Sequence, residues 1–393
     1  MSQAFIELGI GIPLAAALQK SDITEPTPIQ AQVVPLILAG QDVIGQSATG
    51  TGKTLAYLLP LLQSIDAAKR ELQAVVLAPT YELAMQIHRQ AELLIQHSAL
   101  NIAVLPVIGN VNIARQIEKL KEKPQLIVGS SGRILELIQK RKISAQTIKS
   151  IVLDEADRLL EEQSFSSVKA VVKTALRDRQ LCLFSATMNA GAIERAKEFS
   201  DQFVIVREAG AAAAKPDISH MYVVTEHRDK IEELRKLVHS LNIQRGLVFV
   251  NRGDSIGLTT DKLNYLGLKA AGLYGGTKKL DRKKALEDFR DGRVRLLVAS
   301  DVAARGLDIA GIDYVVNLDM TDEPQVYLHR TGRPGRAGNS GVAVSIVARQ
   351  EKWMVEKLEK SLRFKLAVKQ ITRGQVSDVV KLGQPAKSKK KKQ

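Results

Sequence analysis

The sequence predicts an α/β protein made of two tandem, doubly wound parallel-sheet domains joined by a short linker. Short apolar runs alternate with amphipathic segments along most of the chain, which is typical of parallel sheets covered by helices. The alternation stops at residues 208–217, an alanine-rich stretch without a core pattern, and then starts again. We therefore place the first domain at residues 1–207, the linker at 208–217 and the second domain at 218–364.

Apolar runs followed by helical patterns mark the expected strands. In the first domain they are residues 42–46, 74–78, 102–108, 126–129, 151–153, 181–184 and 203–206. In the second domain they are residues 221–225, 247–250, 270–273, 296–299, 315–318 and 342–347. Residues 1–40 should form helices around a turn at residues 25–28, because Pro26 and Pro28 interrupt the chain there.

The chain end is expected to differ from the domains before it. Residues 351–362 should form a closing helix with Trp353 as its packing anchor. The basic segment 365–393, which ends in a run of lysines, is predicted to be disordered. It would act either as a solubilising tail or as a non-specific tether to phosphate groups.

Composition narrows the class of partner. The formal net charge of +15 favours a polyanion, most simply a nucleic acid, over an acidic small substrate, with a solvated basic surface as the alternative. The single cysteine, Cys182, lies in an apolar run and should be a buried, inert thiol, so neither a disulfide nor a structural metal is expected. Without an apolar run of membrane-spanning length or a secretory pattern, we expect a cytoplasmic protein that does not bind membranes.

A glycine-rich stretch at residues 47–54 follows the first apolar run and opens a helical segment. Strand, glycine loop, Gly-Lys-Thr and helix is the layout of a phosphate-binding loop. The glycines let successive N–H groups point at one anion, and the helix N-terminus adds positive charge. Lys53 should reach the β- and γ-phosphates, while Thr54 should hold Mg²⁺. The predicted ATP- or GTP-binding residues are Ser47, Ala48, Thr49, Gly50, Thr51, Gly52, Lys53 and Thr54, with Ser47 standing where the general pattern has glycine.

Two acidic residues, Asp154 and Glu155, directly follow the apolar run at residues 151–153. Carboxylates at the end of a buried strand are costly unless a cation or a hydrogen-bond donor meets them. After a phosphate-binding loop, Mg²⁺ held through Asp154 would supply that partner, and Glu155 would orient or deprotonate the attacking water. A solvated strand end with a helix cap is the alternative.

Together, the loop, the Asp-Glu-Ala-Asp tetrad at residues 154–157 and the motifs below resemble those of the DEAD-box RNA helicases, a family of helicase superfamily 2 with two RecA-like domains. The resemblance covers approximately residues 5–347 and implies two RecA-like folds, ATP and Mg²⁺ as cofactors, and RNA as partner. Pro26–Gln30 resembles the family's adenine-reading segment, with a plain turn as the alternative. There, Gln30 would hydrogen-bond the adenine edge and Phe5 would stack on the ring, which favours ATP over GTP.

Two further motifs resemble those of the family's second domain. Residues 300–308 are similar to its motif V, which implies that Gly306 and Asp308 contact the nucleotide. Residues 329–336 resemble its motif VI, in which Arg333 and Arg336 act as arginine fingers on the γ-phosphate and His329 links to the catalytic acids. Arginine suits this task because guanidinium binds phosphate bidentately. A basic loop that touches nucleic acid is the alternative for this segment.

The resemblance also assigns coupling and RNA contacts. The residues that couple the ATP state to the RNA surface would be Asp157, Ser185, Thr187 and Arg305. The RNA contacts would be Pro79, Thr80, Gly109, Gly132, Arg133, Asn251, Arg252, Gly275, Arg282, Ser300 and Asp301. ATP and RNA would then close the two domains together, bend one RNA strand and release its partner, and the protein core would work as a monomer.

Several positions depart from the family's usual residues. They are Tyr81, Asn110, Ser131, Tyr274, Lys279 and Pro334. Because most of them fall in RNA-side motifs, we hypothesise weaker or altered RNA contact with ATP chemistry retained. The leading prediction is an ATP-dependent RNA helicase. The alternatives are an ATP-gated RNA clamp that unwinds poorly and a DNA-directed translocase of the same superfamily.

Overall fold

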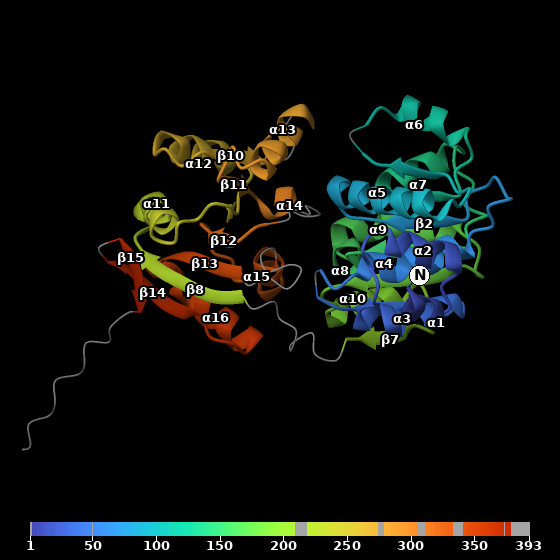
Figure 1. Cartoon of the computed structure of the whole chain (residues 1–393), viewed down its shortest axis with the longest axis horizontal. Helices are drawn as coiled ribbons and strands as arrows, with labels where there is room; N and C mark the ends of the chain where they lie inside the picture. Colours follow the sequence, from blue (N-terminus) through green and yellow to red (C-terminus); the bar gives the residue numbers. More distant parts are fainter. Residues whose placement is uncertain are drawn as a thin grey trace, which may run out of the picture. The chain divides into compact units, whose positions relative to one another are not determined.

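A computed structural model gives the architecture (Figure 1). It describes residues 2–48, 50–109, 111–208, 218–273, 279–304, 311–332, 341–372 and 374–378. These residues divide into two compact units, one before and one after residues 209–217. Each unit is an α/β fold built on a largely parallel sheet, as the sequence predicts.

The sheet of the first unit has, among the described residues, seven parallel strands in the order β3-β4-β2-β5-β6-β1-β7. Their bounds are β1 Val43–Gln46, β2 Ala74–Leu77, β3 Val104–Val107, β4 Leu126–Gly129, β5 Ser150–Asp154, β6 Gln180–Ser185 and β7 Val204–Arg207. The predicted apolar runs match these strands to within about two residues, because a strand buried on both faces is apolar at nearly every position.

Helices cover both faces of this sheet. They are α1 Gln3–Glu7, α2 Ile12–Gln19, α3 Pro28–Leu38, α4 Lys53–Ser64, α5 Tyr81–Ser98, α6 Ile113–Leu120, α7 Ser131–Gln139, α8 Ala156–Leu159, α9 Glu162–Thr174 and α10 Ala190–Lys197. Along β2, Val76 packs into the core beneath α1–α5, whereas Val75 and Leu77 pack into the core beneath α7–α10. The alternation of side chains thus builds two cores on one sheet. Cys182 is buried as predicted, and burial raises the pKa of its thiol.

The sheet of the second unit has, among the described residues, the order β10-β11-β9-β12-β13-β8-β14-β15. Its strands are β8 Ile218–Thr225, β9 Gly246–Phe249, β10 Ala270–Leu273, β11 Leu296–Ala299, β12 Tyr314–Asn317, β13 Gly341–Ala348, β14 Ala367–Thr372 and β15 Gln375–Asp378. Its α-helices are α11 Lys230–Ser240, α12 Ser255–Tyr265, α13 Lys279–Arg290, α14 Asp301–Ala304, α15 Pro324–Thr331 and α16 Lys352–Leu362. In Figure 1, α11 and α12 lie on one side of this sheet and α16 lies on the other.

Two predictions for the chain end are wrong. The predicted disorder of segment 365–393 is wrong for residues 367–372 and 375–378, because β14 pairs with β8 and with β15 in an antiparallel hairpin. Residues 373 and 379–393 lie outside the described residues, and the prediction for them stays a prediction. Ile371 and Val376 pack against the core of this unit. Trp353 is 51% exposed rather than an anchor; Val355 and Leu358 carry the buried face of α16.

Candidate active site

The glycine loop connects β1 to α4 at the carboxyl end of the parallel sheet. Gly50 and Gly52 have φ angles of +84° and +88°, a left-handed conformation that glycine adopts without the strain of a Cβ atom. Gly52 is the N-cap of α4, so Lys53 and Thr54 form its first turn. The predicted order of strand, glycine loop and helix is therefore present, and the N–H groups of the first turn are available to an anion.

Lys53 folds back over the loop that it follows. Its ammonium group donates hydrogen bonds to the backbone oxygens of Ser47 and Ala48, each at 2.6 Å. Burial lowers the pKa of Lys53 to about 8, although the charges of Asp154, Glu155, Asp157 and Glu208 act in the opposite direction. The loop thus keeps its cation in place through two carbonyl groups, which phosphate oxygens are able to replace.

Ser47 is fully buried and tied into the loop. Its N–H donates to the backbone oxygen of Ser185 at 3.2 Å, and its hydroxyl is hydrogen-bonded to the hydroxyl of Thr51. Thr51 in turn donates to the backbone oxygen of Ala48 at 2.8 Å. The serine that replaces the usual glycine therefore connects the loop to the end of β6.

The predicted adenine-reading residues are already engaged within the protein. The side-chain oxygen of Gln30 accepts from the N–H of Thr27 at 3.0 Å, and its amide nitrogen donates to the backbone oxygen of Gly52 at 3.0 Å. Gln30 therefore links the start of α3 to the loop. Phe5 lies in the core with no exposed area, so its side chain would have to move before it could stack on a base.

Asp154 ends β5 beside the loop helix. One carboxylate oxygen accepts from the hydroxyl of Tyr57 at 2.7 Å, and the other accepts from the N–H of Glu155 at 2.9 Å. Burial raises the pKa of Asp154, and the Tyr57 hydrogen bond and the charge of Lys53 oppose this shift. Tyr57 lies one turn beyond Lys53 on α4, so this tyrosine, which sequence reasoning missed, joins the loop helix to the acidic tetrad.

Glu155 is held in an unusual backbone conformation. Its φ and ψ angles are both 51°, in the left-handed region, at the start of the short helix α8. This conformation costs a non-glycine residue about 1–2 kcal/mol, and such outliers gather at functional sites. The Glu155 carboxylate lies 3.7 Å from the guanidinium of Arg158, which is buried. The turn that separates Asp154 from α8 is therefore fixed by the surrounding fold.

The predicted coupling residues of the first unit do contact each other. Thr187 donates through its hydroxyl to a carboxylate oxygen of Asp157 at 2.8 Å, and its N–H donates to the Ser185 hydroxyl at 3.2 Å. Since Ser185 also binds Ser47 through its backbone, the contacts run from the glycine loop to the tetrad. Their role in coupling stays a prediction.

The polar residues of the second unit converge on Arg330, which is 1% exposed. Two of its nitrogens donate to the two carboxylate oxygens of Asp301, each at 2.6 Å. It also donates to the side chain of Asn251 at 2.8 Å and to the backbone oxygen of Asp319 at 2.7 Å, and it lies 5.1 Å from the ring centre of Phe249. Sequence reasoning gave Arg330 no role of its own; the signal was its place within the segment 329–336 that resembles motif VI.

Several predicted RNA contacts already have partners within their own unit. Arg133 donates to the backbone oxygen of Val111 at 3.0 Å and pairs with Glu136 at 3.1 Å. Arg282 donates to the backbone oxygen of Ala303 at 2.7 Å. Thr80 caps α5 by accepting from the N–H of Leu83 at 3.2 Å. A contact between RNA and these side chains would therefore add to or replace an internal bond.

Other predicted residues are exposed or lie outside the described part of the chain. Arg252 is exposed and pairs with Asp254 at 2.6 Å, and a Cβ atom at Gly109 or Gly132 would meet no heavy atom within 4 Å. The following predicted or departing positions lie outside the described residues: Thr49, Asn110, Tyr274, Gly275, Arg305, Gly306, Asp308, Arg333, Pro334 and Arg336.

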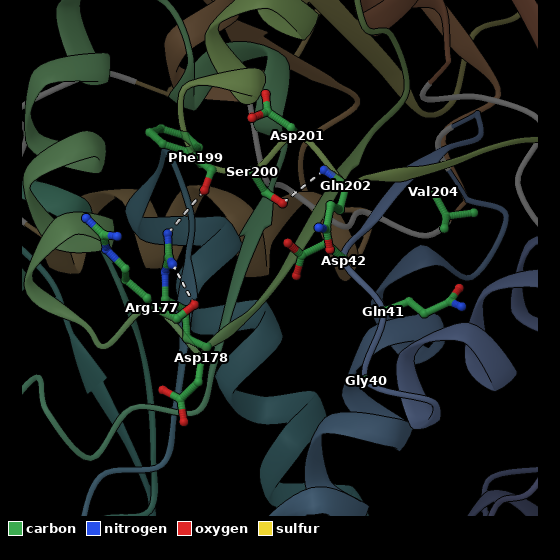
Figure 2. Close-up of a pocket in the computed structure, with 11 residues that line it drawn as sticks. Gly40, Gln41, Asp42, Arg177, Asp178, Phe199, Ser200, Asp201, Gln202 and Val204 are labelled. Atoms are coloured by element: carbon green, nitrogen blue, oxygen red, sulfur yellow. Dashed lines mark hydrogen bonds between the residues drawn. The ribbon is translucent and has the colours of Figure 1, made fainter.

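A cavity of about 590 Å³ lies at the opposite end of the same sheet, where β1, β6 and β7 begin (Figure 2). Asp42, Arg179 and Gln202 line it just before those strands. Asp42 accepts from the N–H of Leu181 at 2.7 Å, and Arg179 donates to the backbone oxygen of Phe199 at 3.3 Å. Ligands of parallel α/β sheets bind at the carboxyl ends of the strands, so this cavity is separate from the candidate active site.

Family models match both units. The model described as DEAD/DEAH box helicase matches residues 27–196, and the model described as helicase conserved C-terminal domain matches residues 229–338. The matched ranges contain the glycine loop, the acidic tetrad and the Arg330 network.

Similar proteins extend over nearly the whole chain. The DEAD-box ATP-dependent RNA helicase CshC of Bacillus cereus is 39% identical over 96% of this chain and 95% of its own length. The probable ATP-dependent RNA helicase YfmL of Bacillus subtilis is 40% identical over 88% of this chain and 91% of its own length. Among solved structures, S. cerevisiae Dbp5 bound to RNA and ADP BeF3 aligns with a TM-score of 0.82 at 28% identity, covering 93% of this chain and 95% of that chain.

Proposed function

The chain belongs to the DEAD/DEAH box helicase family, and from this premise we propose that it is an ATP-dependent RNA helicase that locally unwinds or remodels RNA. One observation carries the proposal for the chemistry. Tyr57, one turn beyond the loop lysine Lys53, donates a hydrogen bond to the buried carboxylate of Asp154 at 2.7 Å. The phosphate-binding element and the acidic tetrad are thereby joined at one edge of the sheet.

The chemistry follows from the charges at this edge. Lys53 would exchange its two backbone carbonyl partners for the β- and γ-phosphates of ATP. Glu155 would orient the attacking water, because its position is fixed by a left-handed turn directly after Asp154. Hydrolysis then proceeds mainly through positioning and charge stabilisation, since phosphoryl transfer demands little covalent chemistry from the protein.

The residues at this edge also fit magnesium. Among the described residues, no group of three or more His, Cys, Asp or Glu side chains is arranged to hold a metal. Mg²⁺ does not need such a group, because it typically keeps several waters and binds through one or two carboxylates together with substrate phosphates. Thr54 and the buried Asp154 would hold it, and bound magnesium would neutralise phosphate charge.

The second unit would contribute Arg333 and Arg336 to the γ-phosphate and His329 to the link with the acids. Nucleotide contacts at Gly306 and Asp308 and the RNA contacts predicted above belong to the same proposal. The network around Arg330 supports it indirectly, because it fixes Asn251 and Asp301 to the helix α15 that leads into residues 332–336. We also propose a cytoplasmic, monomeric core. Separately, no helix among the described residues is both long and apolar enough to cross a bilayer.

A strand-separation assay on a short RNA duplex tests the proposal. With ATP the full chain should release the labelled strand, and with a non-hydrolysable ATP analogue it should bind RNA without repeated release. ATP-dependent binding without any strand release would contradict a helicase and favour a clamp, and repeated release that does not require hydrolysable ATP would contradict the coupling to hydrolysis. Stimulation of ATP hydrolysis by single-stranded DNA as strongly as by RNA would favour a DNA translocase, because only RNA offers the 2′-hydroxyl.

A further inference from the structure

Glu208 lies at the start of the nucleotide loop although it is far from the loop in sequence. It directly follows the edge strand β7, which pairs in parallel with β1. Its N–H donates to the backbone oxygen of Gln46, the last residue of β1, at 3.1 Å. The next residue, Ser47, is one of the two whose backbone oxygens accept hydrogen bonds from Lys53. Glu208 therefore stands beside the loop on the side away from β6.

The Glu208 carboxylate is incompletely satisfied. One of its oxygens, Oε2, is inaccessible to solvent and has no hydrogen-bond partner. A buried carboxylate oxygen without a donor is costly, and a native structure retains one only where something compensates. The Glu208 charge is one of four that raise the pKa of Lys53, so the group is close enough to influence the loop. The hydrolysis scheme above gives this carboxylate no task.

The chemistry of ATP limits which group could donate a hydrogen bond to the Glu208 oxygen. The phosphate oxygens are anionic acceptors and would repel a carboxylate, so a donor supplied by bound ATP would come from the nucleoside. The topology agrees, because α3 packs against β7 and begins beside the loop, where Gln30 is bonded to Gly52. The carboxyl end of β7 therefore faces the segment expected to read the base.

We propose that Glu208 is a specificity-determining residue that accepts a hydrogen bond from the 6-amino group of adenine in bound ATP. The inference rests on the proposed function, since it needs the glycine loop to bind ATP. It also divides the task of base recognition. Gln30, which is bonded to Gly52, keeps its predicted hydrogen bond to the adenine edge, and Glu208 adds a second test at position 6 of the base. Guanine and hypoxanthine carry a carbonyl oxygen at that position, which a carboxylate repels.

Nucleotide affinities measured by calorimetry on the full chain test this proposal with ATP, inosine triphosphate and 2′-deoxy-ATP. Glu208→Ala should weaken ATP binding by about tenfold or more and leave inosine triphosphate unchanged or tighter. Glu208→Gln should admit inosine triphosphate, because an amide is able to donate to the 6-carbonyl. Wild-type protein should bind 2′-deoxy-ATP about as tightly as it binds ATP. If wild-type protein instead binds 2′-deoxy-ATP as weakly as Glu208→Ala binds ATP, the donor is the ribose 2′-hydroxyl and the adenine assignment is overturned.

Controls separate this idea from its competitors. Glu122→Ala, at an exposed position of the same unit, should leave all three affinities unchanged. Binding of inorganic tripolyphosphate and the unfolding temperature of the ligand-free variants report whether the loop remains folded. If Glu208→Ala changes the affinities for ATP, inosine triphosphate and tripolyphosphate by one common factor, Glu208 acts on Lys53 or the phosphates and the proposal fails. If wild-type protein binds no nucleotide, the proposed function fails instead.

Discussion

The two units hold their polar residues in different ways. In the first unit, the loop cation Lys53 is bonded to backbone carbonyls, and Gln30 is bonded to backbone groups at both ends of its amide. In the second unit, Arg330 is bonded to the side chains of Asp301, Asn251 and Asn317, as well as to a backbone carbonyl. Backbone partners are replaceable by a ligand without leaving a charge exposed. Side-chain partners such as Asp301 leave an unpaired charge when the bond is broken.

This difference separates residues that bind from residues that support. Removing the side chain of Lys53 or Gln30 should affect nucleotide binding more than folding. Removing Arg330 should lower folding stability, because the carboxylate of Asp301 and the side-chain amide of Asn251 would lose their hydrogen-bond donor.

The largest expected effect on stability is that of Arg330→Leu. Breaking one side of a buried ion pair costs about 3–5 kcal/mol, so urea unfolding should show the second unit destabilised by that order. Arg252→Ala is the matched control, because its pair with Asp254 is exposed and its loss should leave the urea midpoint unchanged. An Arg330→Leu protein that unfolds at the same urea concentration as the wild type would show that the Arg330 network does not contribute to stability.

The next effect concerns the pH dependence of ATP binding. The pKa of Lys53 is lowered to about 8 in the free protein, so the ammonium group loses its proton as the pH rises past that value. The dissociation constant for ATP should therefore increase by up to about tenfold per pH unit above pH 8. The free energy of unfolding should increase between pH 8 and the ordinary pKa of lysine, even though ATP binding weakens there. In this range Lys53 keeps its proton in the unfolded chain but loses it in the folded protein.

Lys53→Arg provides the control for this titration, since arginine keeps its charge throughout the range. Its ATP affinity, whatever its absolute value, should be flat between pH 7 and 9.5 when measured by calorimetry. A wild-type protein whose ATP affinity is equally flat would mean that Lys53 is not the titrating group.

Tyr57→Phe should lower folding stability less than Arg330→Leu does. It removes the hydroxyl that donates to Asp154, at a cost to stability on the order of 1–3 kcal/mol if the carboxylate stays ionised. Because that hydrogen bond opposes the upward shift of the Asp154 pKa, the acidic limb of the ATPase pH profile should move to higher pH. An acidic limb at the same pH in Tyr57→Phe and the wild type would show that protonation of Asp154 does not set this limb of the ATPase pH profile.

The sequence could predict the elements that are apolar throughout. Parallel strands such as β2 and β4 are buried on both faces, so their residues alone mark them. The β14–β15 hairpin escaped prediction because it lies at an edge of the sheet, where Ala367 and Val368 are exposed and the polar Lys369 and Gln370 are half-buried, so no apolar run marks the strand. Trp353 was misplaced for a related reason, since size does not determine which face of a helix is buried.

At the site, sequence spacing found the residues that belong to compact motifs. Lys53 and Asp154 were predicted because each lies directly beside a recognisable strand end. The roles of Tyr57, Glu208 and Arg330 could not be read from spacing, because their partners Asp154, Gln46 and Asp301 are brought to them only by the folded sheet. Gln30 was identified, but its bond to Gly52 was not.

The most direct test of the account is steady-state ATP hydrolysis by the full chain with and without RNA, compared with Lys53→Ala and Arg336→Ala. We predict RNA-stimulated hydrolysis in the wild type and its loss in both variants. Lys53→Ala should lose nucleotide binding or chemistry, whereas Arg336→Ala should still bind ATP. Near-normal turnover in Arg336→Ala, or wild-type hydrolysis that RNA does not stimulate, would contradict an RNA-dependent ATPase that requires residues from both units.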